Sequence, residues 1–189
     1  MNHFFKFPIV IFIFSLASLS CSKDPKVENQ EELITTLVYT LVPQESGETI
    51  IMTFKDLDGD GGANPIVTVS GSLLVNKTYN STIKLTNESV TPNIDITQEV
   101  KDEAVDHQFF YTLTGGLAGK MAVAYDDKDS NNNPLGIQTK VTTSGTGTGK
   151  MSVTLRHEPN KSAAGVAAGS INNAGGETDI EVSFDVIVK

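Results

Sequence analysis

The sequence predicts an all-β protein, an antiparallel β-sandwich of the immunoglobulin-like type with eight or nine strands and one short crossover helix. Three observations lead to this prediction. Apolar and polar residues alternate with a period of two over short segments, as they do in half-buried strands. Gly, Pro, Asn and Asp separate these segments at intervals of roughly 8–12 residues, as in sandwich folds. A helical period is evident in one segment alone.

The expected strands begin at Leu33 and continue to the end of the chain. The first strand, residues 33–42, is rich in Thr and β-branched residues, and Pro43 ends it. The last strand, residues 180–188, has the cleanest alternation, with every second residue apolar and mostly acids or Ser between. The complete set of expected strands is 33–42, 49–55, 66–69, 79–85, 107–113, 121–125, 137–143, 151–156 and 180–188.

One segment favours a helix instead. Asp95 to Gln98 resembles a capping box, in which an acceptor side chain at the helix start is followed three residues later by Glu or Gln. Val100 and Ala104 are four residues apart and therefore share a helix face. We expect a short helix over residues 97–106 that crosses over the sandwich.

The N-terminal segment has the features of a bacterial signal peptide that ends at a lipidated cysteine. Lys6 precedes the apolar run Ile9–Leu19, which has the length of a signal peptide core and falls short of the roughly 20 residues that span a bilayer. The small residues that close on Cys21 resemble a lipobox, although Ser18 stands where Leu is usual. We expect residues 1–20 to be removed and Cys21 to carry the lipid. The alternatives are an ordinary secretory signal with an unpaired cysteine, or a short anchor helix.

The cysteine content agrees with a lipid anchor, because Cys21 is the single cysteine and a sulfur that carries lipid cannot form a disulfide. Residues 21–32 are polar and charged, which predicts a lipidated cysteine followed by a flexible tether. Residues 33–189 then form one β-sandwich domain. The expected location is the bacterial outer membrane, on its periplasmic face or at the cell surface, with the lipid as the contact to the membrane.

The chain is acidic, with 14 Lys and Arg against 23 Asp and Glu and a net charge of −9. Lys6 is the only one of these charges in the leader, so the mature chain carries −10. This balance argues against nucleic acid as a partner, because no basic cluster is available for phosphates. It also assigns membrane attachment to the acyl group, since an acidic surface repels anionic lipids.

Two Asp-rich loops are candidate calcium sites. Asp56, Asp58 and Asp60 are spaced like the opening of an EF-hand loop, with Gly61 in the sixth position. Val67 stands where an EF-hand requires Glu, so the candidate is a looser calcium loop between strands. A solvent-exposed turn accounts for the same residues. A weaker metal candidate repeats the spacing and consists of Asp127, Asp129 and Asn131.

Two histidines follow the leader, and both adjoin charged residues. His107 follows Asp106, and His157 lies between Arg156 and Glu158. His107, Arg156, His157 and Glu158 are therefore a candidate ligand site, and the two imidazoles could bind zinc or haem iron if their strands are neighbours. The alternative is structural: Arg156 and Glu158 form an ion pair, and His107 caps the C-terminus of the predicted helix.

Motifs for catalysis are not found. Gly145–Lys150 resembles a phosphate loop, but Ser144 and Met151 occupy positions that require Gly and Ser or Thr, and a strand follows. We expect this segment to be a flexible hairpin or linker. The sequence contains neither the G-x-S-x-G nor the H-E-x-x-H motif. We therefore expect a protein that is not an enzyme.

Five segments resemble a family of small Bacteroidota lipoproteins that is usually labelled "type 1 periplasmic binding fold superfamily protein". The resemblance covers most of the mature chain and rests on residues 56–65, 78–80, 106–111, 155–162 and 172–180. The family has no established activity. Its members often accompany TonB-dependent outer-membrane receptors, so the resemblance implies a role in nutrient, metal or haem capture.

Two functions are consistent with these observations. The first is a non-catalytic binding module on the outer membrane, accessory to a TonB-dependent receptor, whose loops at Asp56–Asn64, Asp126–Pro134 and Glu158–Gly176 contact the partner. The last of these loops is long for a simple connection. The alternative is a structural or adhesive surface protein with a calcium-stiffened loop. The sequence leaves the ligand and the oligomeric state open.

Overall fold

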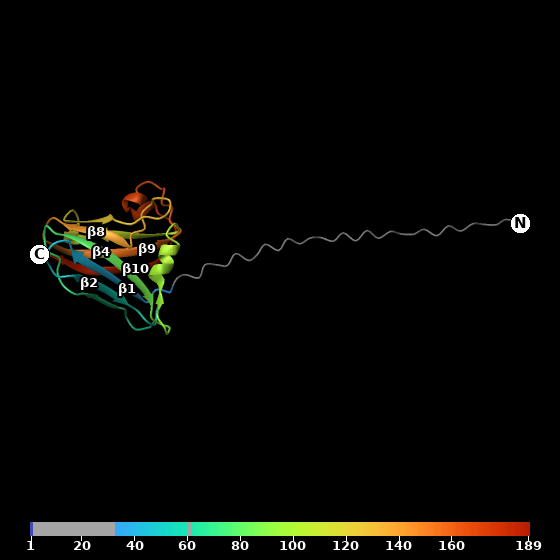
Figure 1. Ribbon diagram of the computed structural model, residues 1–189, viewed down its shortest axis with the longest axis horizontal. Helices are drawn as coiled ribbons and strands as arrows, with labels where there is room; N and C mark the ends of the chain where they lie inside the picture. Colours follow the sequence, from blue (N-terminus) through green and yellow to red (C-terminus); the bar gives the residue numbers. More distant parts are fainter. Residues whose placement is uncertain (2–32, 60–61) are drawn as a thin grey trace. The chain divides into compact units, whose positions relative to one another are not determined.

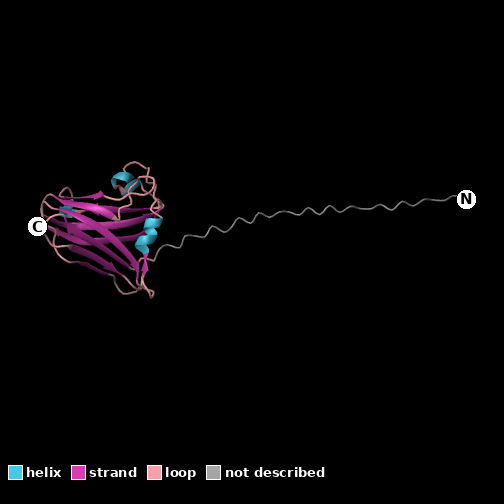
Figure 2. Cartoon of the chain, viewed as in Figure 1, coloured by secondary structure: helices cyan, strands magenta, loops and turns pink. Residues whose placement is uncertain are grey.

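The computed structural model describes Met1, residues 33–59 and residues 62–189. Ten strands, one α-helix and three short 3-10 turns are found among the described residues, and Figure 2 shows strands filling the domain with the helix at one end. The prediction of an antiparallel β-sandwich with one short helix is confirmed. Among the described residues, no helix is long and apolar enough to cross a membrane.

The sandwich consists of two unequal antiparallel sheets. Six strands of the larger sheet run in the order β3-β2-β1-β4-β8-β7, and β5 pairs with β4 beside them. Their bounds are β1 Thr36–Pro43, β2 Ile50–Lys55, β3 Ile66–Val69, β4 Thr78–Asn87, β5 Ile94–Asp95, β7 Met121–Tyr125 and β8 Gln138–Thr143. The smaller sheet has the order β10-β9-β6, with β6 His107–Leu113, β9 Gly147–His157 and β10 Glu177–Val188 (Figure 1).

All nine strands expected from the sequence are present, and β5 is the additional one. β5 was not predicted because its two residues are too short for a period of two to be recognised. The helix α1, Ile96–Asp102, begins one residue before the prediction and ends four residues before it. Its N-cap is Asp95, whose carboxylate accepts a hydrogen bond from the Thr97 amide at 3.0 Å.

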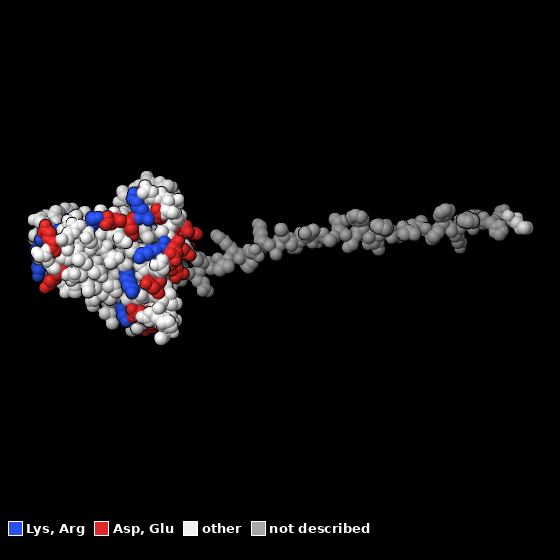
Figure 3. Space-filling model, in the orientation of Figure 1, with Lys and Arg blue, Asp and Glu red and all other residues white. Residues whose placement is uncertain are grey.

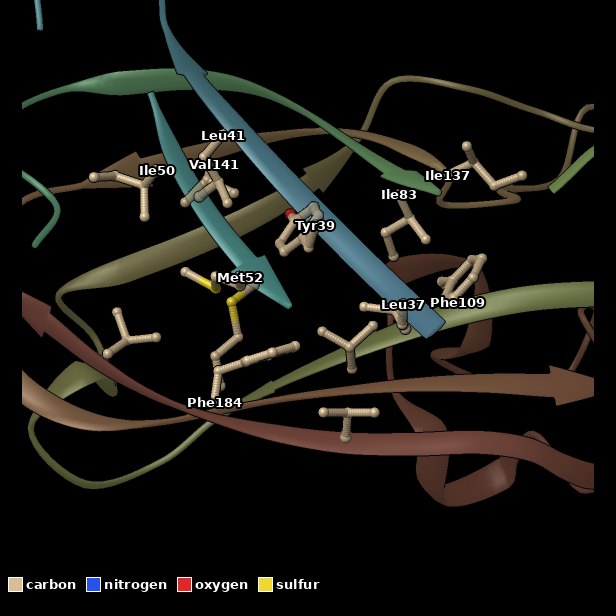
Figure 4. Packing of buried hydrophobic residues seen from close by; sticks show 14 of the residues in the cluster. Leu37, Tyr39, Leu41, Ile50, Met52, Ile83, Phe109, Ile137, Val141 and Phe184 are labelled. Atoms are coloured by element: carbon tan, nitrogen blue, oxygen red, sulfur yellow. The ribbon is translucent and has the colours of Figure 1, made fainter. Parts of the chain in front are cut away.

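The core lies between the two sheets and is largely aliphatic, with a few large aromatic rings. Leu37, Tyr39 and Leu41 alternate along β1 and are fully buried. They lie opposite the inward-facing residues of β2 in the sheet register. Figure 4 shows Met52 of the larger sheet pointing toward Phe184 of β10. Alternation therefore positions one face of each strand in the core.

The glycine-rich segment Gly145–Lys150 differs from its prediction, because its last four residues are the start of β9 and not a flexible hairpin. The 3-10 turn η1, Gly115–Leu117, packs against this part of β9 backbone to backbone. A Cβ atom on Gly147 would lie 2.1 Å from the Gly116 carbonyl oxygen, and one on Gly149 would lie 2.0 Å from that of Thr114. These glycines are thus required by close packing.

Candidate functional site at the α1 end

The three loops nominated from the sequence all emerge at one end of the sandwich, here called the α1 end. Thr36 at the start of β1 pairs with Lys55, the last residue before the first loop. Thr36 also pairs with Thr86, and Thr86 pairs with Asp95 just before α1, so the first loop and α1 lie at the same end. Lys161 of the third loop donates to the carbonyl of Ala104, just after α1, and to that of Pro134 in the second loop, which places these two loops at the same end. Figure 1 shows α1 at the end of the domain opposite the C-terminus.

The third loop is closed around its own small core. It contains the 3-10 turns η2, Val166–Ala168, and η3, Ile171–Asn173. Its buried residues Val166 and Ala174 pack on Phe110, which β6 directs to the outer side of the smaller sheet. The Gln108 side-chain amide donates to the Val166 carbonyl at 3.0 Å. The long loop therefore covers part of the smaller sheet, a role that its small, polar composition did not reveal.

The two histidines are brought together in the structure. His107 and His157 are directly opposite each other on β6 and β9, and their rings stack with centroids 4.8 Å apart and planes within 7° of parallel. His107 Nδ1 donates to the carbonyl of Glu103, the C-cap of α1, at 3.1 Å. The alternative in which His107 caps the helix C-terminus is the arrangement observed.

A third titratable residue, Asp179, adjoins this pair and was missed by the sequence analysis. Its Oδ2 lies 3.8 Å from His107 Nε2, and both side chains are buried. Asp179 stands at a register shift of β10 between Thr178 and Ile180, which interrupts the strand alternation. The sequence carries no signal of this bulge, so the orientation of the Asp179 side chain could not be predicted.

The stacked geometry bears on the metal and haem hypotheses. Imidazole nitrogens bind metal in the plane of the ring, and two nearly parallel, stacked planes do not meet at one ion. Within residues 33–59 and 62–189, no group of three or more His, Cys, Asp or Glu side chains could hold a metal ion. The observed rotamers of His107 and His157 favour a packing role, and the zinc and haem hypotheses require a binding measurement.

Arg156 and Glu158 flank the histidine pair without joining it. Arg156 Nη1 donates to the Gly176 carbonyl at 3.2 Å, which fastens the end of the third loop to β9. Glu158 is exposed, and its backbone adopts φ 49°. Its backbone amide donates a hydrogen bond to the backbone carbonyl of Asp106. Both residues thus shape the loop connection at the α1 end.

The weaker metal candidate contains a cation from the protein itself. Lys161 Nζ lies 2.9 Å from Asp129 Oδ2, and it also donates to the carbonyls of Ala104 and Pro134. Desolvation alone would raise the pKa of Asp129, but Lys161 and the loop amides outweigh it and lower that pKa. An ammonium group therefore occupies the position where a metal ion was considered.

The other residues of this candidate act as turn residues. Both oxygens of Asp127 accept backbone hydrogen bonds, from Gly136 at 2.6 Å and from Gln138 at 2.8 Å. Desolvation raises the pKa of Asp127 despite these bonds. The amide of Asn131 donates to Asp129, while its side chain is exposed. These contacts support the turn interpretation of the second loop.

The first loop is described only in part, because Asp60 and Gly61 lie outside the described residues. Asp56 accepts a hydrogen bond from the Gly59 amide at 3.0 Å, and Asp58 accepts one from the Ala63 amide at 2.9 Å. The Ala63 amide holds the pKa of Asp58 below its usual value. Calcium binding by Asp56, Asp58 and Asp60 stays a prediction, as does lipidation of Cys21, which also lies outside the described residues.

Comparison with known proteins identifies no relative. No family model, no curated protein and no solved structure matches the chain.

Proposed function

We propose that the protein is a non-catalytic binding module, anchored by lipid to the bacterial outer membrane, that acts as an accessory to a membrane receptor in nutrient capture. The observation that supports this proposal is the convergence of the three nominated loops at the α1 end, where the described chain enters the domain. The Thr35 amide donates to the Thr86 carbonyl at 3.1 Å, which places this entry beside the strand that leads to α1.

The entry point links the loops to the membrane. Eleven residues, 22–32, separate Cys21 from Leu33, so the Cα atoms of these two residues lie at most about 40 Å apart when the chain is extended. A lipid on Cys21 therefore keeps the α1 end within this distance of the bilayer. A partner embedded in the same membrane is met first by the loops at that end.

Site-specific photo-crosslinking in the native bacterium tests the partner. A photoreactive residue replaces Ala164, which is exposed in the third loop, and in a control it replaces Glu48, which is exposed in the loop before β2 at the opposite end. The proposal predicts a product with an outer-membrane protein, identified by mass spectrometry, from position 164 alone. Equal products from both positions, or none from position 164, would contradict it.

The anchor has its own test. Cys21→Ala removes the acceptor for lipid, so the variant should leave the membrane fraction and lose the mass of the acyl chains. Ser22→Ala is the matched control and should remain in the membrane fraction. If the Cys21→Ala protein still fractionates with the outer membrane, the lipid is not what holds it there.

A further inference from the structure

The larger sheet has an open outer face, which we define as the outward-facing positions of the six strands from β3 to β7. The register shows that Thr occupies eight of these positions, among them the directly opposed pairs Thr40–Thr82 and Thr78–Thr142. Ile, Val, Ala, Asn and Gln occupy most of the others. Neighbouring strands lie about 4.8 Å apart, so six strands present a surface of about 24 Å from edge to edge.

The charge of this outer face differs from that of the chain. The chain has 23 Asp and Glu, yet none occupies an outward position of these six strands. Lys55 and Lys140 on this face form ion pairs with Glu88 and Asp126 at its margins, and Lys84 is the third cation. In Figure 3, the middle of the face in view is largely white, and red atoms lie at both ends of the domain, with more of them at the α1 end.

This charge distribution selects among partners. A cationic partner would be attracted to the acidic α1 end, and an anionic partner would be repelled by the net charge of the domain. The outer face is therefore suited to a neutral partner. Threonine hydroxyls, together with the amides of Asn80 and Gln138, offer such a partner both donors and acceptors of hydrogen bonds.

The shape and composition of the outer face narrow the partner further. Small ligands bind in concave pockets, whereas this is an open sheet surface. Protein interfaces depend on aromatic, Met and Arg side chains as anchors, and none of these occupies an outward position of the six strands. An extended polymer can instead gain affinity from many weak contacts repeated across the strands.

We propose that the outer face of the larger sheet binds an extended, neutral polysaccharide. Its hydroxyl groups would exchange hydrogen bonds with the Thr, Asn and Gln side chains, and its apolar ring faces would rest on the threonine methyl groups and the exposed Ile51 and Val42 side chains. This surface is separate from the loops of the α1 end, so one molecule can hold a receptor and a glycan together.

Cosedimentation of the full-length protein in mild detergent with cellulose, chitin and granular starch tests this proposal. The variant Thr40→Glu/Thr82→Glu introduces two charges at an opposed pair on the outer face. The matched control, Thr112→Glu/Ser152→Glu, introduces two charges at an opposed pair on the outer side of the smaller sheet. In each pair one residue is exposed and the other is half-buried, and the control additionally loses the 2.7 Å hydrogen bond between the Ser152 and Ser183 hydroxyls.

We expect the native protein and the control to sediment with at least one of the three glycans. The Thr40→Glu/Thr82→Glu protein should bind at least about tenfold more weakly, because the contact would leave a carboxylate desolvated and unpaired. Equal melting temperatures of the two variants would show that folding is not the cause. Equal sedimentation of the two variants, or no sedimentation of the native protein with any glycan, would overturn the proposal.

Discussion

Lys161 and Asp129 form a buried ion pair in which Lys161 Nζ lies 2.9 Å from Asp129 Oδ2, with side chains 5% and 0% exposed. The pair connects the third loop to the second loop, and the Lys161 bond to the Ala104 carbonyl extends the connection to the segment after α1. A single ammonium group thus joins three segments of the α1 end that are distant in the sequence. The arrangement of the second and third loops depends on this contact.

Lys161→Met should destabilise the domain by about 3–5 kcal/mol, because it leaves the Asp129 carboxylate buried without its cation. Urea denaturation at neutral pH measures this loss. Lys128→Met is the control, since Lys128 contacts the exposed Asn132 side chain, and it should change stability by less than about 0.5 kcal/mol.

The double variant Lys161→Met/Asp129→Asn checks the cause of that loss, because Asn keeps an acceptor oxygen for the amides of Asn131 and Asn133. Removing both charges leaves no unpaired ion, so the double variant should recover a large part of the stability that Lys161→Met loses. If the double variant is as unstable as the sum of the two single variants, the ion pair is not the reason for the loss.

Alkaline pH should destabilise the folded domain through Tyr39. Burial raises the pKa of this phenol from 10.0 to about 12, although hydrogen bonds with Ser81 and Thr139 act in the opposite direction. A phenol whose pKa is higher in the folded state stabilises that state while it is protonated. Its contribution is complete below pH 10 and is lost as the pH rises through about 12.

Tyr39→Phe isolates this effect. At pH 8 the variant should be about 1–2 kcal/mol less stable than the native protein, because it loses the hydroxyl bonds to Ser81 and Thr139. Between pH 10 and pH 11.5 the difference should shrink, since Phe cannot ionise. Urea denaturation at a series of pH values measures the unfolding free energy of both proteins. If their difference stays constant from pH 8 to pH 11.5, Tyr39 does not titrate as described.

Gly147→Ala and Gly149→Ala should each destabilise the domain by about 2 kcal/mol or more, because the added methyl group collides with a carbonyl oxygen of the turn around η1. Gly145→Ala is the matched control in the same segment. Its methyl group would lie 3.3 Å from the side-chain carbons of Lys120, which can move aside. Thermal melts compare the three variants. If Gly145→Ala lowers the melting temperature as much as Gly147→Ala and Gly149→Ala do, the packing explanation is wrong.

Zinc and haemin should leave the melting temperature of the chelator-stripped protein unchanged, because the stacked His107 and His157 rings do not aim at a common ion. A site filled a hundredfold above its dissociation constant would add about 2.7 kcal/mol, which a thermal melt detects readily. A rise in melting temperature with zinc or haemin that is absent in His107→Ala or His157→Ala would reinstate the metal or haem site.

Calcium tests the first loop separately. A rise in melting temperature with calcium that is absent in Asp58→Asn would support the calcium-stiffened alternative.

Much of the fold could be predicted from local sequence. The period of two located the nine longer strands, and the Asp95 cap located the start of α1, because strand faces and helix caps depend on neighbouring residues. The helix end was less predictable. The chain leaves the helix after Asp102, and His107 then contacts the Glu103 carbonyl as the first residue of β6.

The candidate site could be predicted only in part. His107, His157 and the three loops were nominated from residue type and length, and the structure brings the two histidines together. Asp179 and Lys161 were missed because each gains its significance from a partner far away in the chain. Lys161 is 32 residues from Asp129, and no local pattern relates the two.

The sequence by itself determined which residues face the core, which nine segments form the longer strands, and the acidic charge of the chain, because alternation and composition are local properties. Only the tertiary structure decided which strands are neighbours. That order stacks His107 on His157, supplies Lys161 as the cation for Asp129, requires glycine at positions 147 and 149, and gathers threonine on an outer face without acids. Each of these contacts depends on the pairing of distant segments, which is set by the packing of the whole core.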